Sequence, residues 1–521
     1  MDTKALRQKI LDLAIRGKLV PQDPNDEPAS VLLERIREQK KQMVKEGKLK
    51  KKDIKNDSII FKGEDNLHYE KFADGSVKYI EDEIPFELPE GWVWTRFSSI
   101  TINRDSERKP ISSSQRTSVA KIYDYYGASG KIDKIDEYIF DERLLLIGED
   151  GANLVTRSKP IAFFAEGQYW VNNHAHCIDA PDKFILEYLY FYINAVNLEK
   201  YVTGSAQPKM TQNNMNSIFV PLPPYNEQKR LNQRLYELMN VVDNIEADKT
   251  KVLELVSMVK NKILDLAIRG KLVPQDPNDE PSSVLLDRIQ TEKEELIKQG
   301  KIKRDKKESI IFKGEDNSYY EKVNGEVHCI DEEIPFEIPD TWEWIRLENC
   351  CKKEIRRGKS PKYTEQSKTL VFAQKCNTKY NGIDIGLAQF LNENTLGKYP
   401  MDEYMQDGDI VINSTGTGTL GRVGFYRAAD NHSDFPIVPD SHVTVIRGFR
   451  SIQAFYLYIF MKANQSELEK KGEGSTNQKE LKPATLKEML VPIPSIIEQE
   501  RISTAIINAF SVITEIEKGL S

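Results

Sequence analysis

The amino-acid sequence predicts an α+β protein, in which two α/β domains are separated by an antiparallel coiled-coil pair of long helices in a circular, pseudo-two-fold arrangement. Three observations lead to this prediction. Blocks of sequence occur twice, two dissimilar segments with strand-like runs lie between them, and one long segment carries a heptad pattern of apolar residues. The chain has 521 residues, which is too long for a single core and suits about three or four structural units.

The repeated blocks are close to verbatim. They read KILDLAIRGKLVPQDPNDEP at both 9–28 and 262–281, EIPFELPEGWVW at 83–94 with EIPFEIPDTWEW at 333–344, and PLPPYNEQKRL at 221–231 with PIPSIIEQERI at 492–502. The period is about half the chain. It therefore indicates a duplicated pair of frames and not a solenoid.

These blocks divide the chain into five predicted parts. They are an N-terminal frame at 1–91, a first variable domain at 92–220, a central frame at 221–341, a second variable domain at 342–491 and a C-terminal helix at 492–521. The variable domains share little sequence, but each is predicted to be mixed α/β. Their strand-like runs lie at 144–148, 161–165, 409–415 and 443–447. In each domain an aromatic helical run and then a Gly-Ser loop follow, with the loops beginning at Gly204 and Gly474.

The longest predicted helix follows Glu227 and ends near Gly270. Its apolar residues recur in alternating steps of four and three, which is typical of a coiled-coil seam: Leu231, Leu235, Leu238, Val242, Ile245, Val252, Val256, Val259, Ile263 and Leu266. The chain ends match parts of this seam, through Ile502, Ile506, Ala509, Ile513, Ile516 and Leu520, and through Leu6, Ile10 and Leu13. We therefore expect the two terminal helices to form a second rod, antiparallel to the first.

The composition excludes several classes of protein. With 39% hydrophobic and 30% charged residues, the chain suits a soluble protein with packed cores. It lacks an apolar run of about 20 residues and a signal-peptide pattern, so we expect a cytoplasmic protein without membrane contact. The five cysteines show no paired spacing, as in a reducing compartment. The net charge of −7 means that any affinity for nucleic acid must come from local basic patches.

Motifs for catalysis and cofactor binding are incomplete. The GxGxxG at 416–421 is followed by a strand-like run instead of a helix, and the GKS at 358–360 lacks the earlier glycine of a phosphate-binding loop. The LPPY at 222–225 has leucine where an amino-methyltransferase tetrapeptide needs Asn or Asp. His174 and His176 share one face of a predicted strand, but no sequence neighbour completes a metal site. We therefore predict no catalytic residue, cofactor site or metal ligand.

Basic and amide side chains lie at matching places in the two variable domains. Such side chains suit contacts with phosphates and base edges. In the first domain the predicted nucleic-acid contacts are Arg104, Arg108, Lys109, Arg116, Ser205, Gln207, Lys209 and Gln212. In the second domain they are Arg356, Arg357, Lys359, Lys362, Tyr363, Ser414, Thr415, Thr417, Arg422, Ser475, Asn477, Gln478 and Lys479.

Several motifs carry a family resemblance. They are LDLAIRGKLVPQDPNDEP in both copies, the P-[LI]-P-x-x-x-E-Q helix starts, YYGASGKIDKIDEYIFD at 125–141, EDGAN at 149–153, WVNNHAH at 170–176, GSAQPKM at 204–210 and INSTGTGTLGRVG at 412–424. Together with the repeated plan, they resemble the specificity subunit of a Type I restriction-modification enzyme, the HsdS family. The resemblance covers nearly the whole chain.

The resemblance implies that each variable domain is a target recognition domain that reads one half of a bipartite site in double-stranded DNA. It implies that the helical frame spaces these domains and docks two modification (methyltransferase) subunits, which restriction (translocase-nuclease) subunits join. S-adenosylmethionine would bind the modification subunits, and ATP and Mg the restriction subunits. This chain would accordingly be non-catalytic and hold no cofactor.

Two other functions are alternatives to DNA recognition within a complex. One is a self-contained fusion of a DNA methyltransferase with its specificity part, against which the incomplete methyl-donor and catalytic motifs count. The other is a coiled-coil scaffold without affinity for DNA, for which the heptad seam alone would account.

Overall fold

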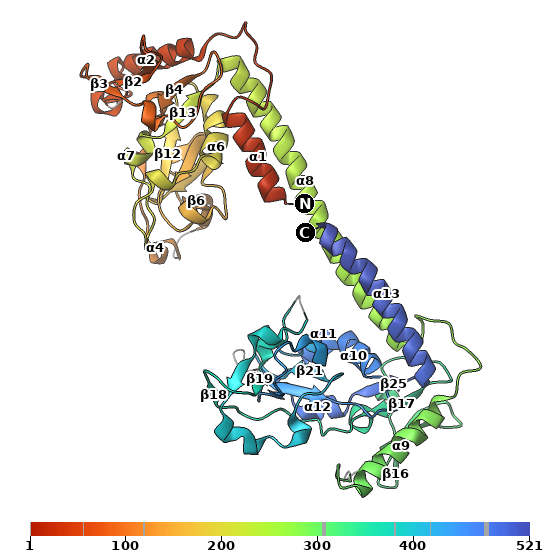
Figure 1. Cartoon of the computed structure of the whole chain (residues 1–521). Helices are drawn as coiled ribbons and strands as arrows, with labels where there is room; N and C mark the ends of the chain where they lie inside the picture. Colours follow the sequence, from red (N-terminus) through yellow and green to blue (C-terminus); the bar gives the residue numbers. More distant parts are fainter. Residues whose placement is uncertain are drawn as a thin grey trace. The chain divides into compact units, whose positions relative to one another are not determined.

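A computed structural model of the chain describes residues 2–55, 57–117, 120–304, 309–379, 382–416, 418–473 and 479–520. It contains two compact units, Met1–Thr250 and Lys251–Ser521. Each unit combines helices with small sheets, as expected for an α+β protein (Figure 1). None of the helices within these ranges has the length and hydrophobicity of a membrane span.

The frame of the first unit contains two helices and a three-stranded antiparallel sheet. Its elements are α1 (Thr3–Ile15), α2 (Ala29–Lys45), β1 (Ile59–Lys62), β2 (His68–Lys71) and β3 (Val77–Tyr79). On the inner face of the sheet, buried Glu70 accepts a hydrogen bond from Arg96 Nη2 at 2.6 Å. This contact ties the sheet to the start of the first variable domain.

The first variable domain contains two four-stranded sheets, ordered β10-β9-β12-β5 and β7-β6-β11-β8. Its elements are β4 (Val93–Arg96), α3 (Phe97–Ile100), β5 (Ile102–Asn103), α4 (Ser113–Thr117), β6 (Tyr123–Gly127), β7 (Gly130–Ile135), β8 (Phe140–Asp141), β9 (Leu144–Gly148), α5 (Asn153–Thr156), β10 (Ala162–Ala165), β11 (Gln168–Val171), β12 (Ala175–Asp179), α6 (Ile185–Ala195), α7 (Gln212–Asn216) and β13 (Phe219–Leu222). The strands β9 and β10 confirm the predicted runs at 144–148 and 161–165.

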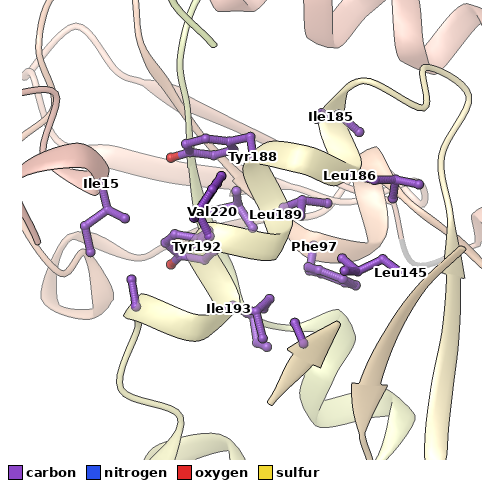
Figure 2. Close-up of a cluster of buried hydrophobic side chains, with 14 of the residues drawn as sticks. Ile15, Phe97, Leu145, Ile185, Leu186, Tyr188, Leu189, Tyr192, Ile193 and Val220 are labelled. Atoms are coloured by element: carbon purple, nitrogen blue, oxygen red, sulfur yellow. The ribbon is translucent and has the colours of Figure 1, made fainter. Parts of the chain in front are cut away.

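The aromatic helix α6 is the centre of the first unit's core. Figure 2 shows Tyr188, Leu189 and Tyr192 among apolar side chains from other elements, including Ile15 of α1 and Val220 of β13. Each tyrosine hydroxyl donates to a backbone carbonyl of β13, with the Tyr188 hydroxyl 2.5 Å from the Pro221 oxygen. A buried tyrosine needs such a partner, because an unpaired hydroxyl in an apolar core is costly.

The second unit repeats the frame order of one helix followed by three strands. Its frame contains α9 (Ser282–Lys298), β14 (Ser309–Lys313), β15 (Tyr319–Val323) and β16 (Glu326–Cys329). The variable domain contains β17 (Glu343–Arg346), β18 (Tyr363–Thr364), β19 (Leu370–Phe372), β20 (Gln389–Leu391), β21 (Ile410–Asn413), β22 (Val423–Phe425), β23 (Ile437–Pro439), β24 (Val443–Ile446), α10 (Ala454–Ala463), α11 (Gln465–Lys470), α12 (Pro483–Lys487) and β25 (Leu490–Ile493). Its sheets are ordered β18-β20-β19-β23 and β22-β21-β24.

In each unit a two-stranded antiparallel sheet joins the two ends of the variable domain. In the first unit β4 pairs with β13, so that Trp94 lies opposite Pro221. In the second unit β17 pairs with β25, so that Trp344 lies opposite Pro492. The chain therefore enters and leaves each variable domain at the same place on the frame.

Long helices complete both frames. The helix α8 (Tyr225–Ile268) is continuous and begins in the first unit, where α1 packs antiparallel to its first part (Figure 1). Arg7 Nη2 lies 2.6 Å from Asp243 Oδ1 at one end of this contact. In the second unit α13 (Ile496–Leu520) packs antiparallel to the last part of α8, and Lys260 Nζ lies 2.8 Å from Glu517 Oε1. The predicted pairing of each terminal helix with the long helix is confirmed within each unit.

The predicted seam is wrong at two positions. Val259 and Ile516 are 49% and 46% exposed, whereas the buried residues at the end of α8 are Leu264, Ala267 and Ile268. A strict heptad seam describes contact with one helix only. The end of α8 packs on two surfaces, α13 and the residues around Trp342. Its buried face is therefore wider than a heptad seam and is shifted toward the buried residues named above.

A hydrogen bond between an indole and a buried carboxylate fixes the start of each long helix. Trp92 Nε1 donates to Glu227 Oε2 at 2.9 Å, and Trp342 Nε1 donates to Glu498 Oε2 at 2.9 Å. The next residue, Gln228, donates to the carbonyl of Pro223 at 2.8 Å, and its counterpart in the second unit does the same. The repeated E-Q pair therefore performs the same structural role twice.

Burial raises the pKa of both Glu227 and Glu498 above the ordinary value, although the indole hydrogen bonds act in the opposite direction. The folded chain therefore keeps a proton on these carboxyls at pH values where the unfolded chain has lost it. Their contribution to stability falls as the pH rises from the ordinary glutamate pKa through the raised one.

We predict that Glu227→Gln is at least as stable as the wild type at neutral pH, because its amide oxygen still accepts from Trp92 and a buried charge is removed. It should also lack part of the pH dependence above about pH 4.5. Glu227→Ala should cost about 1–3 kcal/mol, because the indole loses its acceptor. Calorimetric unfolding of the full chain at several pH values measures both effects.

The matched control is Glu498→Gln, which should change the second unit in the same direction. A Glu227→Gln variant that is destabilised as much as Glu227→Ala would contradict this interpretation.

Candidate nucleic-acid interface

The two variable domains share a strand pair that ends at a loop. In the first domain the Glu149 amide, directly after β9, donates to the His174 carbonyl at 2.9 Å, next to β12. In the second domain the Ser414 amide, directly after β21, donates to the His442 carbonyl at 2.8 Å, next to β24. The two domains therefore have the same backbone arrangement at this point, although their sequences differ.

The Gly-Ser loop of each domain is attached to this strand end. In the first domain Thr203 and Lys209 exchange two backbone hydrogen bonds of 2.8 Å, and the Met210 amide donates to the Glu149 carbonyl at 2.8 Å. In the second domain Glu473 and Glu480 exchange bonds of 2.9 and 2.8 Å, and the Leu481 amide donates to the Ser414 carbonyl at 2.9 Å. We call the paired residues at the base of each loop the loop stem.

Gly204 is required by this geometry. Its φ is +86°, and a Cβ there would lie 2.6 Å from the carbonyl oxygen of Gln207. Any other residue would strain the loop. The predicted contacts Ser205, Gln207, Lys209 and Gln212 all lie on the surface at or near this loop.

In the second domain Lys479 is exposed beside the loop stem. The predicted contacts Ser475, Asn477 and Gln478 of this loop lie outside the described residues, as does Thr417 of the glycine turn.

The arginines of the first basic cluster are engaged in ion pairs within the domain. Arg104 pairs with Glu107 and lies 3.1 Å from Glu142, and the carboxylate of Glu107 raises its pKa above the ordinary value. Arg108 Nη1 lies 2.7 Å from both Glu149 Oε2 and the Ala175 carbonyl. The other members of the cluster are Arg116, which pairs with Asp133 at 2.9 Å, and Lys109, which is exposed.

The second basic cluster follows the same pattern. Arg356 pairs with buried Glu403, and Arg357 Nη2 lies 3.0 Å from Glu480 Oε1 in the loop stem. The Lys359 amine donates to the carbonyl of Lys398. The remaining members, Lys362 and Tyr363, are exposed.

The glycine turn of the second domain is a tight connection between strands. The strand β22 follows it, which confirms the predicted strand and leaves no helix N-terminus for a dinucleotide. Arg422 donates to the carbonyls of Asn377 and Gly418 at 2.7 and 3.0 Å. Ser414 is buried, with its hydroxyl 2.7 Å from Thr444 Oγ1, and Thr415 Oγ1 lies 2.7 Å from His442 Nδ1.

The two histidines considered for a metal site lie in different environments. His174 Nδ1 contacts Asp150 at 2.7 Å, whereas His176 is buried against Asp105. In the described part of the chain, ligand atoms of Asp105, His176 and Glu149 lie within 4.8 Å of one another. Two carboxylates that are far from His176 in the sequence therefore lie beside it in the fold. Cationic side chains from Arg108 and Lys209 already contact the Glu149 carboxylate, so the arrangement is an ion-pair network.

Sequence reasoning missed the acidic partners of the basic clusters. Glu149 and Asp133 lie 41 and 17 residues from Arg108 and Arg116. Only the motif EDGAN at 149–153, which combines acidic residues with a glycine after a strand, gave a signal near this network.

A family model described as the Type I restriction modification DNA specificity domain matches residues 89–255 and 339–521. This chain belongs to that family. Each matched range begins just before a domain-closing strand, β4 or β17, and includes a variable domain with the first part of α8 in one range and all of α13 in the other. The sheet β1-β2-β3 and its copy β14-β15-β16 lie outside the matched specificity domains.

Two relatives from Escherichia coli are similar to this chain. The Type I restriction enzyme EcoAI specificity subunit is 32% identical over 407 residues, which covers 66% of this chain and 62% of the relative. The EcoEI specificity subunit is 32% identical over 403 residues, which covers 66% of this chain and 61% of the relative. The match thus spans less than two thirds of the length of these relatives.

One similar solved structure concerns complex assembly and conformational transition of the type I R-M system. Its chain has 16% identity and a TM-score of 0.48, with 84% of this chain and 94% of that chain covered. The family assignment rests on the sequence match.

The environments of the lysines lead to a chemical prediction. Amine acylation of the folded chain should modify the exposed Lys109 and Lys362 first, because their amines are in water. Lys353 should react at least about tenfold more slowly, because it is buried and its Nζ lies 3.1 Å from Glu403 Oε2. Peptide mass spectrometry over a time course measures these rates.

The matched control in the frame is Lys40, a buried lysine whose Nζ lies 2.6 Å from Asp57 Oδ2 and which should also react slowly. Equal rates for Lys362 and Lys353 would contradict the burial described for the second domain.

Proposed function

We propose that this chain is the non-catalytic DNA-recognition subunit of a Type I restriction-modification complex, and that each variable domain reads one half of a bipartite double-stranded site. The observation that carries the proposal is the loop stem that both domains build on the same strand end with different side chains. Two equivalent scaffolds with different exposed groups suit two different half-sites. The family membership and the names of the relatives support the same function.

The chemistry at the loops suits contact with DNA. The exposed amide of Gln207 can pair with a base edge, and the exposed amines of Lys109 and Lys362 can neutralise phosphates. The chain has a net charge of −7, so its affinity depends on a few such groups. The paired arginines contribute less free charge and instead hold the loops and strands in place.

The long helices suit partner subunits. Within the second unit, Leu255, Met258 and Val512 are 57%, 66% and 64% exposed on α8 and α13. Apolar side chains so exposed on a helix are typical of a surface covered by another chain. We propose that two modification subunits dock on the helical frame and that restriction subunits join them. S-adenosylmethionine, ATP and Mg would then bind the partners, and this chain would hold no cofactor.

The direct test of the proposed function is binding by the chain assembled with its modification subunits. The complex should bind a duplex with the bipartite target at least about 10³-fold more tightly than a random duplex at physiological salt. The purified chain alone should neither bind S-adenosylmethionine nor methylate DNA. Methylation by the chain alone would favour the fusion enzyme, and equal affinity for all duplexes would favour the scaffold.

The modular arrangement predicts the outcome of a domain exchange. Replacing residues 92–220 with the corresponding segment of another family member should change one half of the methylated motif and leave the other unaltered, because β4 and β13 close the domain on itself. Mapping of methylated sites in cells that carry the hybrid measures this. The reciprocal exchange of residues 342–491 is the control. A hybrid in which both halves change together would contradict independent recognition.

The exposed lysines predict the salt dependence of binding. Lys362→Gln should weaken binding on all duplexes and lower the slope of log affinity against log salt by about one, because one fewer counterion is released. Titration of the complex at several salt concentrations measures the slope. The control is Lys62→Gln on the exposed surface of the frame, which should leave the slope unchanged. An unchanged slope for Lys362→Gln would mean that this part of the second domain does not face DNA.

A further inference from the structure

We propose that His176 is a positioning residue of the first variable domain: it joins Asp105 to the base of the Gly-Ser loop and so fixes the loop that reads one half-site. The inference deepens the proposed function and rests on it. His176 is not expected to contact DNA, because its side chain is 1% exposed.

Both ring nitrogens of His176 face oxygen acceptors. Nδ1 lies 2.6 Å from Asp105 Oδ2, and Nε2 lies 2.9 Å from the carbonyl oxygen of Met210. A carbonyl oxygen only accepts, so Nε2 carries a hydrogen and donates it. The ring therefore links the turn after β5 to the residue that follows Lys209 in the loop stem.

Asp105 is held in place for this role. Its Oδ1 accepts a hydrogen bond from the Cys177 amide at 2.8 Å, and Arg108 Nη2 lies 3.3 Å from its Oδ2. Burial acts to raise the pKa of Asp105, but the hydrogen bond and charge of His176, together with Arg108, outweigh burial and lower it. The carboxylate thus orients the ring, as a hydrogen-bonded carboxylate commonly does for histidine.

The loop stem is attached to this network at a second point. Lys209 Nζ lies 3.1 Å from Glu149 Oε1, and Arg108 Nη1 lies 2.7 Å from Glu149 Oε2. The Glu149 carbonyl also accepts from the Met210 amide. Removing the ring would take one hydrogen bond from the Asp105 carboxylate and leave the Met210 carbonyl without the donor that joins it to Asp105, so the stem should open locally while the sheets stay folded.

The second variable domain supplies an internal comparison. The matching hydrogen bonds after β9 and β21 place Ser414 where the first domain has Glu149 and Thr444 where it has His176. Ser414 and Thr444 are fully buried, and their hydroxyl oxygens are 2.7 Å apart. At these matching positions the second domain therefore has a neutral hydroxyl pair in place of a carboxylate and a histidine.

The experiment uses the full chain assembled with its modification subunits and a panel of duplexes with single base changes in each half-site. His176→Ala should reduce discrimination in the half-site of the first domain by about tenfold or more, and discrimination in the other half-site should stay within about twofold of the wild type. Hydrogen exchange at the amides of Thr203, Lys209 and Met210 should accelerate by a similar factor.

Two further variants make the test independent of whether His176→Ala folds. Asp105→Ala removes the carboxylate that holds the ring, and it should give the same half-site pattern. Asp105→Asn is the conservative control, because its amide oxygen can still accept from the Cys177 amide and its Nδ2 can donate to His176 Nδ1, so discrimination should stay within about threefold of the wild type.

The outcomes separate the two proposals. If the wild-type complex does not discriminate between duplexes, the proposed function fails. If it discriminates and Asp105→Ala or His176→Ala leaves the first half-site unaffected, the positioning role is overturned. Equal losses in both half-sites with a lower unfolding temperature would assign His176 a general structural role and would also overturn it. A loss for Asp105→Asn as large as the loss for Asp105→Ala would show that the hydrogen bond to the ring is not what positions the loop, and would also overturn it.

Discussion

The hydrogen bond between a frame indole and the first turn of a long helix is the contact on which each unit depends. Trp92 belongs to the chain entering the first variable domain, and Glu227 belongs to the helix leaving it. One bond therefore fixes the direction of α8 relative to the domain-closing sheet. Because the Glu227 carboxylate is buried, a helix direction that moved it away from the Trp92 indole would leave its Oε2 unpaired. Trp342 and Glu498 repeat the constraint in the second unit.

This constraint explains how the variable domains can differ while the frame stays nearly identical. Each domain begins and ends in one two-stranded sheet, and buried ion pairs hold that sheet to the frame. Arg96 lies 2.6 Å from Glu70 in the first unit, and Arg346 lies 2.7 Å from Glu321 in the second. The core tyrosines Tyr188 and Tyr456 donate to the closing strands at 2.5 and 2.7 Å. Between these fixed ends, the sequence is free to change without altering the position of either end.

Local pattern was sufficient to predict the frame and several strands. The runs at 144–148 and 443–447 are apolar and short, and they form β9 and β24 because buried strands need little beyond hydrophobicity and turn residues. The parallel pairing of β6 with β11 has no such local signature, because its partners lie far apart in the sequence. The seam of α8 was mispredicted near Val259 for a related reason, since a heptad pattern cannot reveal the second surface on which the helix packs.

The candidate interface shows the same limit more sharply. Arginine clusters are visible in a sequence, but the carboxylates that pair with them are not, because Glu149 and Glu480 reach Arg108 and Arg357 only after folding. The sequence therefore overstated the free positive charge at the start of each variable domain. It also treated His174 and His176 as one possible pair of ligands. In the structure His174 lies just before β12 and contacts Asp150, whereas His176 lies within β12 and contacts Asp105.

The two loop stems illustrate what a duplicated scaffold preserves. The backbone hydrogen bonds after β9 and β21 match, but the strand positions beside them hold Glu149 and His176 in the first domain and the hydroxyl pair of Ser414 and Thr444 in the second. The charged version is tolerated because each buried carboxylate in it has a cationic partner, and the neutral version is tolerated because its hydroxyls satisfy each other. Either solution meets the requirement that buried polar groups be paired. The backbone can therefore keep presenting a loop while the side chains beneath it, and those exposed upon it, diverge independently in the two domains.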